Sequence, residues 1–215
     1  MDKQTRIELF KNIDLYPVTT QRLSAGRTSL EILDGILAGG AKIVQLREKE
    51  LPMRELYELA AAFRAKTSEA GALLMINDHI DLALAVDADG VHLGRDDLPL
   101  PAARRIAPEL ILGASSHNLE QALTAQVQGA DYVNIGPIFA TGTKPEHKVF
   151  LGPAAIGEIG PRLDIPFTVM GGINLSNIAS VAAAGARRIA VVTAVTQAPD
   201  VAQAVRELRR MIVGV

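Results

Sequence analysis

Short apolar segments rich in β-branched residues alternate with longer helical segments along the chain, and this unit occurs eight times. The predicted strands are Leu15–Thr19, Lys42–Leu46, Leu73–Ile76, Gly90–Leu93, Leu110–Ala114, Tyr132–Ile135, Phe167–Met170 and Arg188–Val192. The predicted helices are Leu30–Ala38, Met53–Ala70, Asp81–Val86, Pro101–Ile106, Leu119–Gln128, Pro153–Ile159, Leu175–Ala184 and Val201–Ile212. Because parallel strands need a crossover that a helix can fill, this order predicts a parallel sheet.

Eight repeats of this unit in 215 residues favour an α/β fold of the TIM (β/α)8 barrel type over an open, doubly wound sheet. The open sheet usually carries Gly-x-Gly-x-x-Gly after its first strand, where this chain has Thr19-Thr20-Gln21-Arg22. The length suits one domain. We therefore expect residues 1–215 to form a single (β/α)8 barrel domain, with residues 1–12 as a short N-terminal extension.

The composition points to small-molecule substrates. Lys and Arg number 22 against 24 Asp and Glu, and aromatic residues make up 4%, so nucleic acid is not expected as a partner. No apolar run reaches the length of a membrane span, and Met1–Lys11 lacks signal-peptide features. The absence of cysteine excludes disulfides and thiolate metal sites. We expect no membrane partner and a cytoplasmic location by default.

Three polar residues, each two positions from the next, stand at and just after the carboxyl end of the second predicted strand. Gln45, Arg47 and Lys49 point toward one face, because side chains alternate along an extended segment. In a β/α barrel the carboxyl ends of all strands meet at one mouth, where catalytic residues lie. An arginine fork and a lysine charge suit phosphate oxygens. The sequence therefore indicates a phosphate site here, with an ordinary solvated loop as the alternative.

Aspartates follow the third and fourth predicted strands, as Asp78 and Asp97. Carboxylates at the ends of adjacent strands can hold one hard divalent cation, and Mg²⁺ commonly takes one or two of them together with water and substrate phosphates. We therefore expect one Mg²⁺ bound by this pair. The alternative is that Asp78 caps a helix and Asp97 caps a turn.

Hydroxyl and imidazole groups follow the fifth predicted strand, in Ser115, Ser116 and His117. Adjacent placement on one turn gives poor geometry for a Ser/His nucleophile, so we expect hydrogen bonding to substrate instead. His79 and His92 lack the spacing of zinc ligands, and we expect structural or hydrogen-bonding roles for them.

The long segment after the sixth predicted strand, residues 136–152, carries Thr141, Thr143 and Lys144 beside glycine and proline. We interpret it as a lid over an anionic substrate, and a plain surface loop is the alternative.

Gly171-Gly172 and Val192-Thr193 close the last two predicted strands. In β/α barrels these two loops often bind phosphate through backbone N–H groups, so Gly172 and Thr193 are our phosphate candidates. A Gly-Gly turn followed by helix capping from Asn174 or Ser176 is a compatible interpretation.

Taken in order, these motifs resemble the thiamine-phosphate synthase family. The resemblance runs from Leu15 to Ala204 and rests on Gln45-Leu46-Arg47-Glu48-Lys49, Ile76-Asn77-Asp78, Gly90-Val91-His92-Leu93-Gly94 with Asp97, Gly113 to His117, Gly136-Pro137 through Thr143-Lys144, and Gly171-Gly172-Ile173. It implies a β/α barrel transferase of thiamine biosynthesis. Such an enzyme joins a pyrimidinylmethyl diphosphate to a thiazole phosphate and releases pyrophosphate.

The resemblance also implies a role for each matching residue. The residues implied to bind the pyrimidine diphosphate are Gln45, Arg47, Lys49, Asn77, Ser115 and Lys144. Those implied to be catalytic are Arg47, Lys49, Ser115 and Lys144. The residues implied to bind the thiazole phosphate are Thr141, Thr143, Gly172, Val192 and Thr193. Asp78 and Asp97 would hold one Mg²⁺ per site, the expected cofactor.

The chain departs from the family pattern at Gly142, at Asn134, at Arg187-Arg188 and in the loop Pro145–Phe150. Two rival functions stay open: a thiazole tautomerase on the same barrel, using a histidine such as His117, and a non-catalytic ligand-binding relative. A tautomerase has no pyrophosphate to neutralise, so the two aspartates and the Gln-x-Arg-x-Lys run argue against it. Assembly into a homo-oligomer is also left open.

Overall fold

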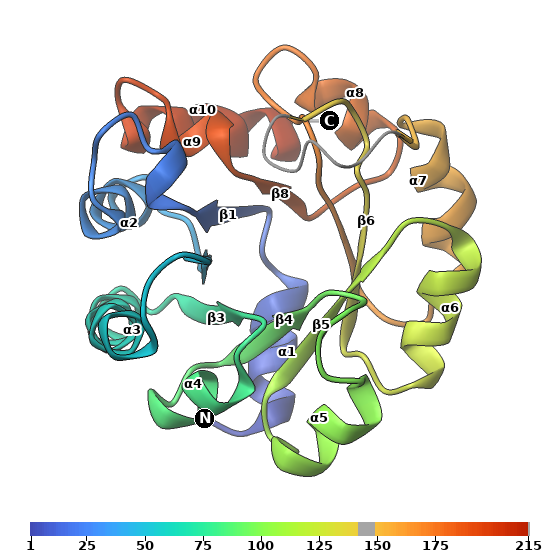
Figure 1. Cartoon of the computed structure of the whole chain (residues 1–215). Coiled ribbons are helices and arrows are strands. Elements are labelled where there is room, and N and C mark those ends of the chain that lie inside the picture. The colour runs from blue at the N-terminus through green and yellow to red at the C-terminus, as the bar shows by residue number, and fades with distance from the viewer. Residues whose placement is uncertain (142–148, 215) are drawn as a thin grey trace.

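The computed structural model describes residues 1–141 and 149–214, and within them eight parallel strands close into a barrel in chain order (Figure 1). The strands are β1 Leu15–Thr19, β2 Ile43–Leu46, β3 Leu73–Asn77, β4 Gly90–Leu93, β5 Ile111–Ser116, β6 Tyr132–Ile135, β7 Phe167–Val169 and β8 Ile189–Val191. β8 pairs with β1, so the sheet has no free edge. The predicted TIM barrel is confirmed, with strand ends shifted by at most two residues.

The helices lie around the outside of the barrel, except for α1, which lies at its amino end (Figure 1). They are α1 Lys3–Lys11, α2 Ser29–Ala38, α3 Met53–Glu69, α4 Ile80–Ala85, α5 Leu100–Ile106, α6 Leu119–Val127, α7 Ala154–Ile159, α8 Ile178–Ala183, α9 Thr193–Thr196 and α10 Val201–Val213, with 3-10 turns η1 Gln21–Leu23 and η2 Gly160–Arg162. Among the described helices, none combines the length and apolar composition needed to cross a bilayer.

The helix predicted at Leu175–Ala184 begins later than expected, at Ile178. The residues before it form a turn in which the Asn177 side chain accepts the N–H of Asn174, at 2.8 Å. Asn177 occupies the N-cap position and its side chain makes no capping bond. The expectation that Asn174 or Ser176 caps this helix is therefore wrong, because both are engaged within the preceding turn.

Alternation along each strand divides the core into two layers. Side chains inside the barrel, among them Tyr16, Met75 and Tyr132, form one buried cluster. Side chains on the outer face, such as Leu74 and Val133, pack against the surrounding helices in the other. The period of two therefore sends every second strand residue toward the barrel axis, and near the carboxyl ends toward the mouth.

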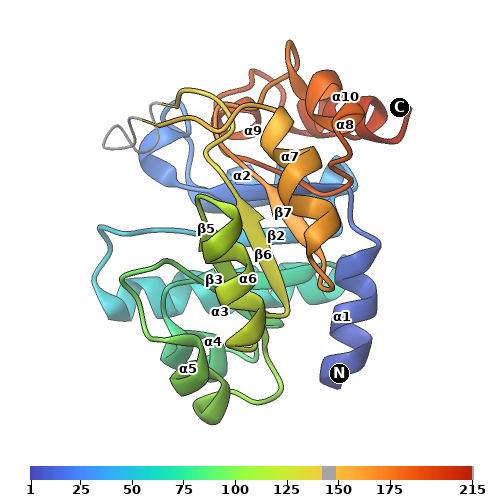
Figure 2. The same cartoon turned by 90° about the vertical axis from the view of Figure 1, so that its right-hand side faces the viewer.

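The expected N-terminal extension contains α1, which closes the amino end of the barrel (Figure 2). Phe10 is 1% exposed, and its ring packs against that of Tyr132 with 4.3 Å between centroids. Arg188, just before β8, donates from its guanidinium to the carbonyl oxygens of Phe10 and Lys11 at the end of α1. Arg188, one of the residues at which the chain departs from the family pattern, therefore makes these contacts at the amino end of the barrel, away from the mouth.

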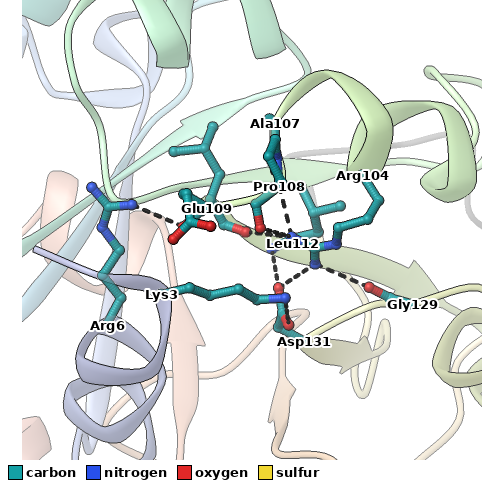
Figure 3. Close-up of polar contacts among 10 residues, drawn as sticks. Lys3, Arg6, Arg104, Ala107, Pro108, Glu109, Leu112, Gly129 and Asp131 are labelled. Carbon is teal, nitrogen blue, oxygen red and sulfur yellow. Dashed lines mark hydrogen bonds and ion pairs between the residues drawn. The ribbon is translucent and has the colours of Figure 1, made fainter.

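Charged side chains join α1 to the starts of β5 and β6 (Figure 3). Lys3 and Arg104 both pair with Asp131, whose carboxylate also accepts the backbone N–H of Leu112 at 2.8 Å. Arg6 donates to the carbonyl of Glu109 at 2.8 Å. These contacts satisfy backbone groups at the amino end, and the carboxyl end is where the cavity described below opens.

Candidate active site

A cavity of about 790 Å³ opens at the carboxyl ends of the strands. Eleven residues singled out from the sequence line it, namely Gln45, Arg47, Lys49, Asn77, Asp78, Asp97, Ser115, Thr141, Gly172, Val192 and Thr193. Residues as far apart in the chain as Gln45 and Thr193 therefore share one site. Gly142, Thr143 and Lys144 lie outside the described residues, as does the rest of the proposed lid from 145 to 148.

An ion pair joins the ends of β2 and β3 on one side of this cavity. The ammonium nitrogen of Lys49 lies 3.0 Å from Oδ2 of Asp78. Asp78 adopts φ +64°, a left-handed conformation that aspartate tolerates better than most residues, and its N–H donates to the carbonyl of His92 at 2.9 Å. This tight turn directly after β3 brings the Asp78 carboxylate to the cavity wall.

Asp78 and Asp97 are close enough to act as one electrostatic unit. Burial would raise the pKa of Asp78, but hydrogen bonding with Asp97 and the charge of Lys49 outweigh it and lower that pKa below its usual value. For Asp97, burial comes first and the neighbouring Asp78 carboxylate adds to it, so its pKa is raised. Two carboxylates whose pKa values move apart in this way are paired across a short distance.

The donor set of this pair fits Mg²⁺. Both side chains offer oxygen, the ligand atom that hard cations prefer. Within residues 1–141 and 149–214 no cluster of three or more His, Cys, Asp or Glu side chains forms a closed metal site. One or two carboxylates are what Mg²⁺ commonly takes from a protein when water and substrate phosphates complete its shell.

The capping alternatives are resolved differently for the two aspartates. Asp97 Oδ2 accepts the N–H of Gly94 at 2.6 Å, so this residue does cap a turn while it also lines the cavity. Asp78 does not cap α4, whose N-cap residue is His79 and which has no side-chain capping bond.

His92 on β4 makes the hydrogen bonds expected of it. Its Nδ1 lies 2.9 Å from the hydroxyl oxygen of Tyr132, and its Nε2 lies 3.0 Å from Oγ of Ser115. The Nδ1 of His117 contacts the carbonyl oxygen of Gly136. Ser115 is therefore bonded to His92 on the neighbouring strand, consistent with the expectation against a Ser/His nucleophile within the turn after β5.

The opposite side of the cavity is formed by the ends of β7 and β8. Gly171 and Gly172 adopt φ +112° and +63°, and a Cβ on Gly172 would lie 2.3 Å from the carbonyl oxygen of Ala140. Thr193 is the first residue of α9, a helix that the sequence did not predict. The first N–H groups of a helix have no partner within it, so this turn offers donors at the cavity wall.

The lining residues that were not singled out as site residues from the sequence include Arg22, Arg95, Asn134 and Met170. Arg22 and Arg95 follow β1 and β4, so applying the strand-end rule to every strand would have found them. Asn134 had been noted only as a departure. Its Oδ1 accepts a hydrogen bond from Thr168 at 2.9 Å on the next strand.

Comparison with known proteins agrees with this geometry. The sequence profile of the family described as thiamine monophosphate synthase matches residues 15–195. Proteins named thiamine-phosphate synthase from Moorella thermoacetica and Pyrococcus horikoshii are 50% and 46% identical to the chain, over 93% and 94% of it and 95% and 96% of theirs.

A solved structure shows the same similarity in three dimensions. The thiamine phosphate pyrophosphorylase from Pyrococcus furiosus superposes with a TM-score of 0.88 at 40% identity, covering 98% of each chain. The profile match spans most of the chain, and the relatives are similar along nearly their whole length. The chain belongs to the thiamine monophosphate synthase family.

Proposed function

We propose that this protein is a thiamine-phosphate synthase, a transferase that condenses a pyrimidinylmethyl diphosphate with a thiazole phosphate. The observation that carries the proposal is the division of one cavity into two halves. A carboxylate pair with Lys49 and Arg47 lies at the ends of β2 to β4, and a glycine turn with the first turn of α9 lies at the ends of β7 and β8. Two phosphorylated substrates can bind there side by side.

The reaction breaks the bond between the pyrimidinylmethyl carbon and the diphosphate oxygen, and the electron pair leaves with pyrophosphate. The electron-rich pyrimidine ring stabilises the cationic carbon that remains. The thiazole nitrogen then donates its lone pair to that carbon, forming the C–N bond of thiamine phosphate. The step needs neutralisation of the departing charge rather than a protein nucleophile.

The residues of the β2 to β4 half bind and neutralise the leaving group. Arg47 and Lys49 place positive charge beside the diphosphate oxygens, and the Ser115 hydroxyl and the Asn77 amide offer further hydrogen bonds. Asp78 and Asp97 would hold Mg²⁺, which when bound supplies Lewis-acid stabilisation of a departing diphosphate. Lys144, a further cation expected from the sequence, belongs to the same proposed group.

The β7 and β8 half binds the acceptor. Gly172 and Thr193 present backbone N–H groups to the thiazole phosphate, beside Val192, and Thr141 and Thr143 add hydroxyl donors in the proposal. A closing lid would exclude water, which competes with the thiazole nitrogen for the cationic carbon. The single-domain organisation and the cytoplasmic location remain predictions from the sequence. Whether the protein assembles into a homo-oligomer stays open.

The two rival functions are less well supported. A thiazole tautomerase needs a proton-transferring histidine but no leaving-group neutralisation, and it gives no reason for paired carboxylates beside Lys49. A non-catalytic relative would likewise not need them. The relatives from Moorella thermoacetica and Pyrococcus horikoshii are both named as synthases.

One assay tests the proposal. The purified protein is mixed with 4-amino-2-methyl-5-(diphosphooxymethyl)pyrimidine, the thiazole phosphate and Mg²⁺, and pyrophosphate and thiamine phosphate are measured. We expect both products in equal amounts, and neither after chelation of the metal. Absence of thiamine phosphate with Mg²⁺, Mn²⁺ and Co²⁺ alike would reject the synthase function.

A further inference from the structure

A chain of hydrogen bonds crosses the barrel interior and ends at the cavity. Gln45 Nε2 donates to the hydroxyl oxygen of Tyr16 at 2.9 Å, and that hydroxyl lies 3.2 Å from the hydroxyl of Tyr132. Tyr132 reaches Nδ1 of His92 at 2.9 Å, and Nε2 of His92 reaches Ser115 at 3.0 Å. Five side chains from five strands therefore form one continuous path.

The packing around Tyr132 makes this path specific. Gly113 on β5 lies between Tyr132 on β6 and His92 on β4, and it is the Cα partner of both in the strand register. A Cβ at Gly113 would lie 2.2 Å from the Tyr132 ring. The glycine thus lets the phenol cross an intervening strand to reach the imidazole.

Both phenols are fully buried, with Tyr16 at 1% and Tyr132 at 0% exposure. Burial raises the pKa of each phenol above its ordinary value, so both remain protonated at neutral pH. Each therefore has one hydrogen to donate and lone pairs to accept with.

The donor at the start fixes the direction of every bond that follows. The amide nitrogen of Gln45 can only donate, so Tyr16 accepts there. Among the described residues, the Tyr16 hydroxyl has one other partner, Tyr132, and its buried hydrogen finds an acceptor only if Tyr16 donates to Tyr132. Tyr132 then donates to Nδ1 of His92, which leaves the hydrogen of the neutral imidazole on Nε2.

We propose that Tyr132 is a positioning residue that holds neutral His92 as the Nε2–H tautomer and thereby makes Ser115 a hydrogen-bond donor to the diphosphate. His92 donates to the Ser115 oxygen, so the serine hydrogen is available to an acceptor in the cavity. With the opposite tautomer Ser115 would donate to His92 and turn its lone pairs toward the anionic substrate, a repulsive arrangement. This inference rests on the proposed function for its substrate, but the tautomer itself does not.

The tautomer can be measured directly in the unliganded wild-type protein. Long-range ¹H–¹⁵N correlation spectra distinguish the two neutral forms of histidine, and loss of the signal in His92→Gln assigns it. We expect the hydrogen on Nε2. In Tyr132→Phe, which removes the donor to Nδ1, we expect a mixture of tautomers. Tyr16→Phe keeps the Tyr132 hydroxyl but removes the group that fixes the direction of its bonds, so a mixture of tautomers is expected there as well. Tyr57→Phe changes an exposed tyrosine outside the path and should leave the tautomer unchanged.

Turnover tests whether Tyr132 acts through Ser115. Loss of one hydrogen bond to a charged group should lower kcat in Tyr132→Phe by about tenfold to a hundredfold, with a smaller change in KM for the pyrimidine diphosphate. In a Ser115→Ala background the same substitution should have little further effect, because the bond is already gone. A general structural defect would lower kcat equally in both backgrounds.

Two results would overturn the inference: a hydrogen on Nδ1 of His92 in the wild type, or an undiminished effect of Tyr132→Phe in the Ser115→Ala background. The wild-type spectrum needs no variant to fold, so the first test stands even where a variant is unstable. If the wild type formed no thiamine phosphate, the proposed function would fail, and the spectrum would still decide the tautomer.

Discussion

The ammonium group of Lys49 and the carboxylate of Asp78 form an ion pair with 3.0 Å between Nζ and Oδ2, which connects the end of β2 to the end of β3. Asp97, in the loop after strand β4, hydrogen bonds with the same carboxylate. One carboxylate therefore faces both a cation of the chain and a second acid. A divalent cation bound between the two acids would relieve the repulsion between them.

Asp78→Asn should lower kcat by about a hundredfold or more, because the variant loses one charge of the pair proposed to hold Mg²⁺ beside the leaving group. Binding of the thiazole phosphate on the β7 and β8 side should change by less than about threefold, since distant sites are nearly independent. Steady-state kinetics and calorimetry measure the two effects. Asp81→Asn on the exposed start of α4 makes the same change in charge outside the cavity and should leave kcat unaltered.

Lys49→Gln should affect metal binding and turnover in opposite directions. Removal of the ammonium charge eliminates a competitor for Asp78, so Mn²⁺ should bind more tightly in the absence of substrate, as followed by electron paramagnetic resonance. Turnover should fall, because the same charge is proposed to neutralise the diphosphate. Lys66→Gln removes a lysine from a pair with Asp34 on the outer surface, at 2.7 Å, and should change neither quantity. Weaker Mn²⁺ binding in Lys49→Gln would contradict the assignment.

Gly172→Ala should weaken acceptor binding. The new Cβ would lie 2.3 Å from the Ala140 carbonyl oxygen, so the glycine turn must shift, and KM for the thiazole phosphate should rise by about tenfold or more. Gly71→Ala is the matched control, since Gly71 has φ +62° against +63° for Gly172 but no atom within 4 Å of its Cβ. Both variants should lose about 1 kcal/mol of stability from the left-handed backbone. An equal change in KM in the two would show that the clash is unimportant.

Alkaline pH should destabilise the fold through Tyr16 and Tyr132. Burial raises the pKa of both phenols above the ordinary 10.0, so the unfolded chain loses these protons first. Their contribution to the free energy of unfolding is constant below that pH and falls as pH rises above it. The Tyr57→Phe variant keeps only the two buried tyrosines, so its tyrosinate absorbance reports on Tyr16 and Tyr132 alone. As pH rises, this absorbance should appear together with the loss of helical circular dichroism. Tyrosinate formation in the still folded protein would contradict this.

Much of the site could be predicted from the sequence because β/α barrels collect strand ends at one mouth. Once the strands were found, Gln45, Asp78 and Gly172 could be placed in one site without knowing any distance. Arg22 and Arg95 follow the same rule and were overlooked only because it was applied to some strands and not to all. The start of α8 at Ile178 was mispredicted because local side-chain bonds in the Asn174–Asn177 turn compete with the helix.

The sequence by itself determined the alternation of strands and helices, the barrel, and which residues stand at its mouth, since these follow from periodicity and chain order. Only the tertiary structure decided which of those residues touch. The pairing of Lys49 with Asp78, the insertion of Phe10 under the barrel, and the path from Tyr132 across Gly113 to His92 depend on strand register and side-chain packing. Contacts of this kind join residues far apart in the chain, and no local pattern encodes them.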